Sequence, residues 1–188
     1  MDKVNTYSGK RVDPFNPVVA DVDIVDIAHQ LSQKCRFNGA TKHFYSVAEH
    51  SIFVAEQVSD PLKLWGLLHD GHEIWSGDQS RPIKGRLCVE TRGHGVLSIE
   101  QWHFLELRLQ KVIAEKFNLS WPMPFEVEEA DDRMMVTEFR DLIHGEHESP
   151  FAAKPYDFTL CGGGSGLSSE AAKVMFLNAF ERYSEERG

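Results

Sequence analysis

The chain has 188 residues, 41% of them hydrophobic, and a formal net charge of -9 at neutral pH. This length supports one substantial core and fits one domain, residues 1–188, better than two. The acidic excess argues against a protein that binds polynucleotides, because such proteins meet the phosphates with many lysines and arginines. A mononucleotide needs only a local positive pocket.

The sequence also bears on the compartment. It shows no leader-like pattern of basic and apolar residues and no run of about eighteen apolar residues, so we expect neither secretion nor a membrane partner. Its three cysteines lack CxxC spacing and are odd in number, which argues against a disulfide framework or a cysteine zinc site. We therefore expect a cytoplasmic protein.

The first half of the chain predicts three helices after an irregular start. Residues 1–20 are rich in turn formers and predict an N-terminal arm, either extended or folded as a short hairpin. Apolar residues at helical spacing predict a short helix over residues 23–33 and further helices over residues 46–58 and 62–73.

The second half predicts longer helices separated by irregular segments. Residues 79–97 have no clear period and predict a loop. Residues 99–117 and 124–142 predict helices, and residues 143–168 predict an irregular connector. A last helix, residues 169–186, is expected after a cap at one of two adjacent serines, with its apolar face against the body or a neighbouring subunit. The expected fold class is all-α.

Three of the predicted apolar faces carry polar residues. His50 and His69 interrupt two of them, and Asp131 lies on the face of residues 124–142. A buried carboxylate is costly unless it is paired or coordinates a cation. Taken alone, His50 is explained by a backbone partner in the core and Asp131 by a surface ion pair. Together with Asp70, they compose a first shell of two histidines and two aspartates with open positions.

Four stretches of sequence resemble a known family. They are Arg36-Phe37, the segment from Phe44 to His50, the segment Leu67-Leu68-His69-Asp70-Gly71-His72-Glu73, and Gly77-Asp78 followed by Arg81-Pro82-Ile83-Lys84. They resemble the HD-domain metal-dependent phosphohydrolases of the 5'-deoxynucleotidase branch, including small phage-type deoxynucleoside triphosphate hydrolases that act on dATP. The resemblance covers roughly residues 5 to 142. It implies a compact helical HD-domain with a metal site between core helices.

The resemblance implies a metal site of four ligands. These are His50, His69, Asp70 and Asp131, with Asp132 as the competing candidate for the last position. Histidine and carboxylate ligands suit Co, Mn, Zn or Fe better than Ca, and Mg would accompany a triphosphate substrate.

The resemblance also assigns roles around the metal. Glu73 would act as general base or acid, and Asp78 would position the attacking water. Arg36 and Lys84 would bind the substrate phosphates, although a helix-end charge and a solvated basic loop explain them equally well without the family. A base pocket would involve two aromatic residues that are equally well explained as core residues, Phe37 and Trp75.

The implied reaction is water attack at the α-phosphorus of a deoxynucleotide, which cleaves the 5'-phosphoester. A deoxynucleoside triphosphate would yield deoxynucleoside and triphosphate, and the alternative substrate is a deoxynucleoside monophosphate. The resemblance further implies a homo-oligomer, located in the host cytoplasm if the chain is phage-encoded.

Two other functions remain open at this stage. A di-iron oxygenase of the same fold would need a second metal site from His72, His94 or His103. A nucleotide sensor without catalysis would need neither Glu73 nor Asp78, so the presence of both favours an enzyme.

Overall fold

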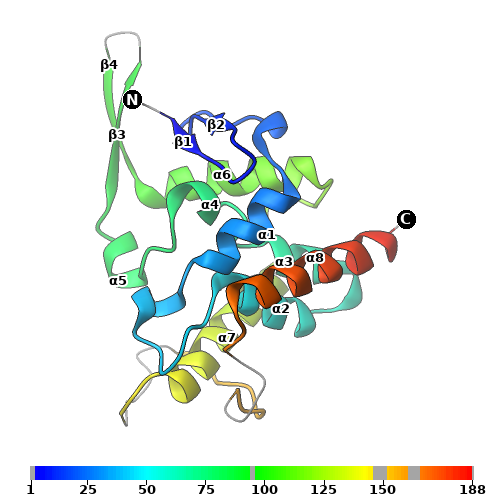
Figure 1. Cartoon of the computed structure of the whole chain (residues 1–188). Coiled ribbons are helices and arrows are strands. Elements are labelled where there is room, and N and C mark those ends of the chain that lie inside the picture. Colours follow the sequence, from blue (N-terminus) through cyan, green and yellow to red (C-terminus); the bar gives the residue numbers. More distant parts are fainter. Residues whose placement is uncertain (1–2, 94–95, 146–151, 161–165, 188) are drawn as a thin grey trace.

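The computed structural model of the chain describes residues 3–93, 96–145, 152–160 and 166–187. Most of this part is helical, with two small antiparallel sheets (Figure 1). The α-helices are α1 (Ile24–Gln33), α2 (Val47–Glu56), α3 (Lys63–Leu68), α4 (Glu73–Ser76), α5 (Arg81–Lys84), α6 (Trp102–Lys116), α7 (Phe125–Leu142) and α8 (Ser169–Glu185). Three short 3-10 helices are η1 (Val19–Asp21), η2 (Arg36–Gly39) and η3 (Asp60–Leu62).

The core lies where α2 meets its neighbours. α1, α3 and α8 pack against α2, α8 also packs against α1 and α3, and α7 covers α2 and α3 from another side (Figure 1). Fully buried side chains from these helices and from α6 fill the space between them, among them Ile27, Leu31, Leu67, Leu109 and Phe176. Burial of such apolar surface is the main source of folding free energy.

Capping residues fix several helix starts. The side chains of Asp23, Ser46 and Ser168 accept hydrogen bonds from backbone N–H groups in the first turns of α1, α2 and α8. These bonds satisfy donors that have no partner within the helix. The helices predicted over residues 23–33 and 124–142 are confirmed, and so are those over residues 46–58 and 169–186, to within two residues at each end.

The predicted loop at residues 79–97 is wrong in part. It contains α5, and strand β3 (Cys88–Gly93) pairs with β4 (Val96–Gln101) in a hairpin that extends from the body (Figure 1). Ile99, placed in a helix by its spacing, lies in β4 and is 67% exposed, so α6 begins only at Trp102. A short apolar pattern does not distinguish strand from helix, and here cross-strand pairing decides. The fold is mostly helical rather than all-α.

The helix predicted over residues 62–73 is interrupted. α3 ends at Leu68, a turn follows, and α4 begins at Glu73. A Cβ on Gly71 would lie 3.0 Å from the Leu68 carbonyl oxygen, a tight contact, so the turn favours a residue without a side chain. Gly77 then ends α4 with a φ of +81°, a conformation that favours glycine.

The predicted N-terminal arm and the predicted connector are irregular or hairpin-like in the parts that the structure describes. At the N-terminus, β1 (Val4–Asn5) and β2 (Arg11–Val12) form a short hairpin. In the connector, residues 143–145, 152–160 and 166–168 contain no regular helix or strand, whereas residues 146–151 and 161–165 lie outside the described part. The connector is tied down where Asp141 accepts the Leu160 N–H at 2.8 Å and Glu49 accepts the Gly166 N–H at 2.8 Å.

The apolar face of α8 packs against the body of its own chain. Its Ala172, Phe176, Ala179 and Tyr183 are all buried. This face is therefore used within the monomer rather than kept for a neighbouring subunit. Across the residues that the structure describes, none of the helices has the length and apolar character needed to span a bilayer.

The packing of α8 yields a stability prediction. Phe176→Ala should lower the free energy of unfolding by about 3–5 kcal/mol, because it leaves a cavity beneath α8. Urea unfolding followed by circular dichroism measures the change. Met175→Ala, at a neighbouring position that is 45% exposed, should change it by less than about 1 kcal/mol. Equal effects would contradict the assigned packing of α8.

Candidate metal centre

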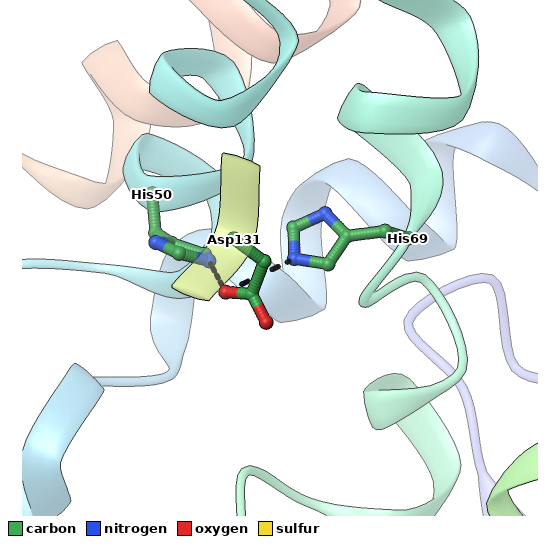
Figure 2. Close-up of side chains that lie close together, drawn as sticks. All are labelled: His50, His69 and Asp131. Atoms are coloured by element: carbon green, nitrogen blue, oxygen red, sulfur yellow. Dashed lines mark ion pairs between the residues drawn. The ribbon is translucent and has the colours of Figure 1, made fainter. Parts of the chain in front are cut away.

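Two histidines and one aspartate converge from three helical segments. His50 comes from the middle of α2, His69 from the end of α3 and Asp131 from α7, and their polar ends point toward one another (Figure 2). Asp131 Oδ1 lies 3.0 Å from His50 Nε2 and 3.8 Å from His69 Nε2. One ligand atom from each residue lies within 4.8 Å of the others, so the group could hold a metal ion.

Asp70 adds a second carboxylate beside the same ring nitrogens. Its Oδ2 lies 3.2 Å from His69 Nε2 and 3.8 Å from His50 Nε2. The adjacent pair His69 and Asp70 therefore reaches the cluster together, because the chain leaves the α3 helix at this point and turns.

The outer ring nitrogens fix the orientation of both imidazoles. His69 Nδ1 lies 2.7 Å from the Gly66 carbonyl oxygen, which can only accept, so Nδ1 carries the proton. His50 Nδ1 lies 2.5 Å from Glu138 Oε1. A carboxylate or carbonyl behind a ligating histidine is the usual arrangement in metal sites, since it presents the Nε2 lone pair to the ion.

The inner ring nitrogens fit a metal. The Nε2 atoms of His50 and His69 are buried and face carboxylate oxygens at 3.0 and 3.2 Å, yet neither makes a hydrogen bond of good geometry among the residues that the structure describes. Buried polar atoms are normally satisfied, so such atoms call for an explanation. Two imidazole nitrogens next to carboxylate oxygens match the donor set of a divalent transition metal.

The electrostatics of the cluster favour positive charge between the rings. Burial and Arg36 oppose protonation of His50, but Glu138 and Asp131 outweigh them and raise its pKa to about 9. Burial opposes the charge of Asp131, but His50 and His69 hold the pKa of that carboxyl below its usual range.

A glycine allows the two histidine-bearing helices to approach closely. A Cβ on Gly66 of α3 would lie 2.8 Å from the Cα of Ala55 in α2. No side chain fits this contact without moving the backbone. The close approach leaves the His50 and His69 rings with centroids 5.2 Å apart.

Arg36 lies at the edge of the cluster among carboxylates. Its guanidinium is 3.1 Å from Glu138 Oε2, 3.9 Å from Asp70 Oδ2 and 4.0 Å from Asp78 Oδ2. Burial opposes its charge, but these carboxylates raise the pKa of Arg36 above its ordinary value. The residue expected to bind phosphate is thus a fixed cation beside the candidate ligands.

Glu73 and Lys84 lie together near Asp70. Glu73 is 1% exposed, and its Oε1 lies 3.6 Å from Lys84 Nζ. Burial, together with Asp70 and Asp78, raises the pKa of Glu73 well above its usual range, and Lys84 opposes this shift. Burial also raises the pKa of Asp78, with Asp70 adding to the shift and Arg36 opposing it.

The choice between two adjacent aspartates on α7 is resolved. Asp131 lies with the imidazoles, whereas Asp132 forms an ion pair with Arg81 of α5. The same guanidinium is 3.6 Å from Asp131 Oδ2. The expected ligand Asp131 is therefore the one that the fold places in the cluster.

The expected base-pocket residues lie in different surroundings. Trp75 is 6% exposed and packs in the hydrophobic core, so it offers no free face for a base, and this part of the prediction is corrected. Phe37 is half-buried in η2, and its ring centroid lies 5.6 Å from the Arg36 guanidinium carbon. Only Phe37 lies beside the expected phosphate site.

The two extra histidines that the structure describes do not join the cluster. His103 is exposed on α6, and His72 is buried with its Nε2 3.7 Å from Glu106 Oε1. His94 lies outside the described residues. Within the described ranges, His50, His69 and Asp131 are the group that could hold a metal.

Sequence reasoning missed the role of two residues. Glu138, seven residues after Asp131, lies on the same helical face and contacts His50 Nδ1, a role that the sequence analysis did not assign. Its carboxylate also accepts a hydrogen bond from Tyr45 at 2.8 Å, a residue within a family-like segment that was given no role. A buried carboxylate two helical turns from a candidate ligand was the available signal.

Two bacterial proteins are similar to this chain. YfdR, an uncharacterized protein of Escherichia coli, is 35% identical over 144 residues, which is 76% of this chain and 73% of YfdR. The chain belongs to the YfdR family. An uncharacterized protein of Rhodobacter capsulatus is 33% identical over 132 residues, or 65% of this chain and 62% of that protein. No family model matches the sequence.

The geometry predicts which aspartate of this YfdR-family protein is needed for metal. Asp131→Ala should lose most of the bound divalent metal after loading with Mn or Co, because it removes the carboxylate between the two imidazoles. Asp132→Ala, the matched control, should keep it. Elemental analysis by plasma mass spectrometry after gel filtration gives the metal content, and equal loss in both variants would contradict the assignment.

Glu138 yields a second prediction. Glu138→Gln should weaken metal binding by about 10- to 100-fold, because the neutral amide no longer supports the proton on His50 Nδ1. Competition with a chromophoric chelator measures the affinity. Glu128→Gln, at an exposed position on the same helix, should leave it unchanged. An unaltered affinity in Glu138→Gln would show that this carboxylate acts on packing alone.

Proposed function

We propose that this chain is an HD-domain metal-dependent phosphohydrolase that cleaves the 5'-phosphoester of deoxynucleotides by water attack at the α-phosphorus. Deoxynucleoside triphosphates, dATP among them, would yield deoxynucleoside and triphosphate. The observation that carries the proposal is the convergence of the buried Nε2 atoms of His50 and His69 on the carboxylates of Asp70 and Asp131, without a hydrogen bond of good geometry at either nitrogen among the described residues. The family resemblance of the same residues supports it.

The metal ligands of the proposal come from three helical segments. His50, His69, Asp70 and Asp131 would hold one divalent ion of Co, Mn, Zn or Fe. Such an ion polarises a phosphoryl oxygen and lowers the pKa of a water molecule, so that a nucleophile is available near neutral pH. Glu138 and the Gly66 carbonyl keep the two rings oriented for this task.

Two carboxylates outside the ligand set would handle water and protons. Glu73 is buried next to Asp70 and has an oxygen, Oε2, without a hydrogen-bond partner among the described residues. A proton-exchanging group needs such a free position, so Glu73 is the general acid or base of the reaction. Asp78, held 4.0 Å from Arg36, would orient the attacking water.

The cations beside the cluster fit a phosphate ester. Arg36 would bind the oxygens around the α-phosphorus, because its planar guanidinium can contact two of them at once. Lys84 would add a second positive charge. Arg81, 45% exposed at its side chain and paired with Asp132, is a third cation near the cluster, which fits a triphosphate better than a monophosphate. A 5'-deoxynucleotidase acting on monophosphates is the alternative.

Turnover assays test the proposal. Mn- or Co-loaded protein is incubated with each deoxynucleoside mono- and triphosphate, and the products are separated by chromatography. Deoxynucleoside with intact triphosphate is expected, and turnover of monophosphates alone would indicate the alternative. Glu73→Gln should lower kcat by about 10²- to 10⁴-fold while the metal content stays constant. Glu115→Gln, an exposed change on α6, is the matched control. Absence of turnover with every nucleotide, despite bound metal, would contradict the proposal.

A further inference from the structure

Helix α6 reaches the candidate site through one carboxylate that has no assigned role. Glu106 is 13% exposed at its side chain, and its Oε1 is buried. It faces Lys84 of α5, whose Nζ lies 2.8 Å from that oxygen. α6 carries none of the candidate metal ligands, so this contact is its link to the residues of the candidate site.

Lys84 is shared between two carboxylates. Its Nζ lies 2.8 Å from Glu106 Oε1 and 3.6 Å from Glu73 Oε1. Glu106 is therefore the nearer partner, and Glu73 is the second. The buried ring of His72 also lies next to Glu106, with its Nε2 3.7 Å from Glu106 Oε1.

The charge state of Glu106 fits the role of an anchor. Burial would raise its pKa, but His72 and Lys84 outweigh burial and lower it to about 2. The carboxylate is thus ionised throughout the neutral range. Burial likewise opposes the charge of Lys84, and Glu73, Asp70 and Glu106 together raise the pKa of the ammonium above its ordinary value.

We propose that Glu106 is a positioning residue for the phosphohydrolase reaction, which holds the Lys84 ammonium at the rim of the metal site and away from full pairing with Glu73. This inference rests on the proposed function. A lysine side chain is flexible and loses much rotamer freedom when it is fixed. The ionised Glu106 already fixes the Lys84 side chain before substrate binds, so this entropy is not lost on binding. Glu73 meanwhile remains available for proton transfer.

Removal of the charge on Glu106 has a definite consequence in this arrangement. Among the residues that the structure describes, Glu73 would then be the one carboxylate within 4 Å of Lys84. The ammonium would move onto Glu73, which withdraws the cation from the phosphate and occupies the proton-transfer group at the same time. Both effects lower the rate, although Glu106 touches neither the phosphate nor the metal ligands.

A double-mutant cycle tests the inference. Glu106→Gln should lower kcat/KM by about 10-fold, and by little or nothing further in a Lys84→Met protein, because the residue acts through Lys84. Glu100→Gln is the matched control. Glu100 of β4 pairs at 2.6 Å with Arg108 of α6, the helix that carries Glu106, but this ion pair is exposed. The control should leave kcat/KM unchanged. Metal content and the unfolding midpoint in urea are measured for every variant.

Binding of inorganic triphosphate to the metal-loaded protein, measured by calorimetry, gives a readout without turnover. The inference is supported if Glu106→Gln weakens triphosphate binding in the otherwise unmodified protein but has no further effect on binding in a Lys84→Met protein. This holds even if no nucleotide is hydrolysed, and in that case the proposed reaction alone fails. Additive losses in the two variants, or unchanged or tighter binding in Glu106→Gln, overturn the inference while leaving the reaction intact. Failure of the unmodified protein to bind triphosphate overturns the inference, whereas the proposed reaction is decided by the turnover assay.

Discussion

The buried carboxylate of Glu138 is the interaction on which the site depends. It is fully buried and contacts Arg36 at 3.1 Å, Tyr45 at 2.8 Å and His50 at 2.5 Å. An ionised carboxylate in the core costs several kcal/mol unless it is paired and hydrogen-bonded, and here each oxygen has a partner. Three separate segments are therefore held to α7 at one point: the turn before α2, α2 itself and η2. This junction fixes the position of α2, which carries His50, relative to α7, which carries Asp131.

The charge balance around that junction bears on the proposed binding of a phosphate ester by an acidic protein. Glu138, Asp70 and Asp78 surround the guanidinium of Arg36, so the cation is retained although it is buried. The carboxylates in turn attract positive charge to the space between the imidazoles, where His50 has a pKa of about 9. A divalent ion there would satisfy the carboxylates and leave the guanidinium freer to pair with phosphate oxygens.

Helical periodicity located the main helices and placed His50 and Asp131 on buried faces, because the period of a regular helix fixes which residues share a face. It failed where the chain departs from regular structure. The β3–β4 hairpin has strands of six residues, too short for an apolar pattern to separate from a helix. The turn after His69 depends on close contacts of Gly71, and the burial of Trp75 depends on which helices cover it. Contacts between distant segments decide all three.

The residues of the candidate site fall into two groups, one on long helices packed in the core and one on short helices. His50 and Asp131 lie on helices of ten and eighteen residues that pack in the core. Glu73 and Lys84 lie on α4 and α5, helices of four residues joined through Gly77. A metal site needs a fixed geometry, whereas residues that meet the substrate must fit its phosphates. Under the proposed function, substitutions in the short helices would change the preference among phosphate esters and leave the candidate metal ligands in place.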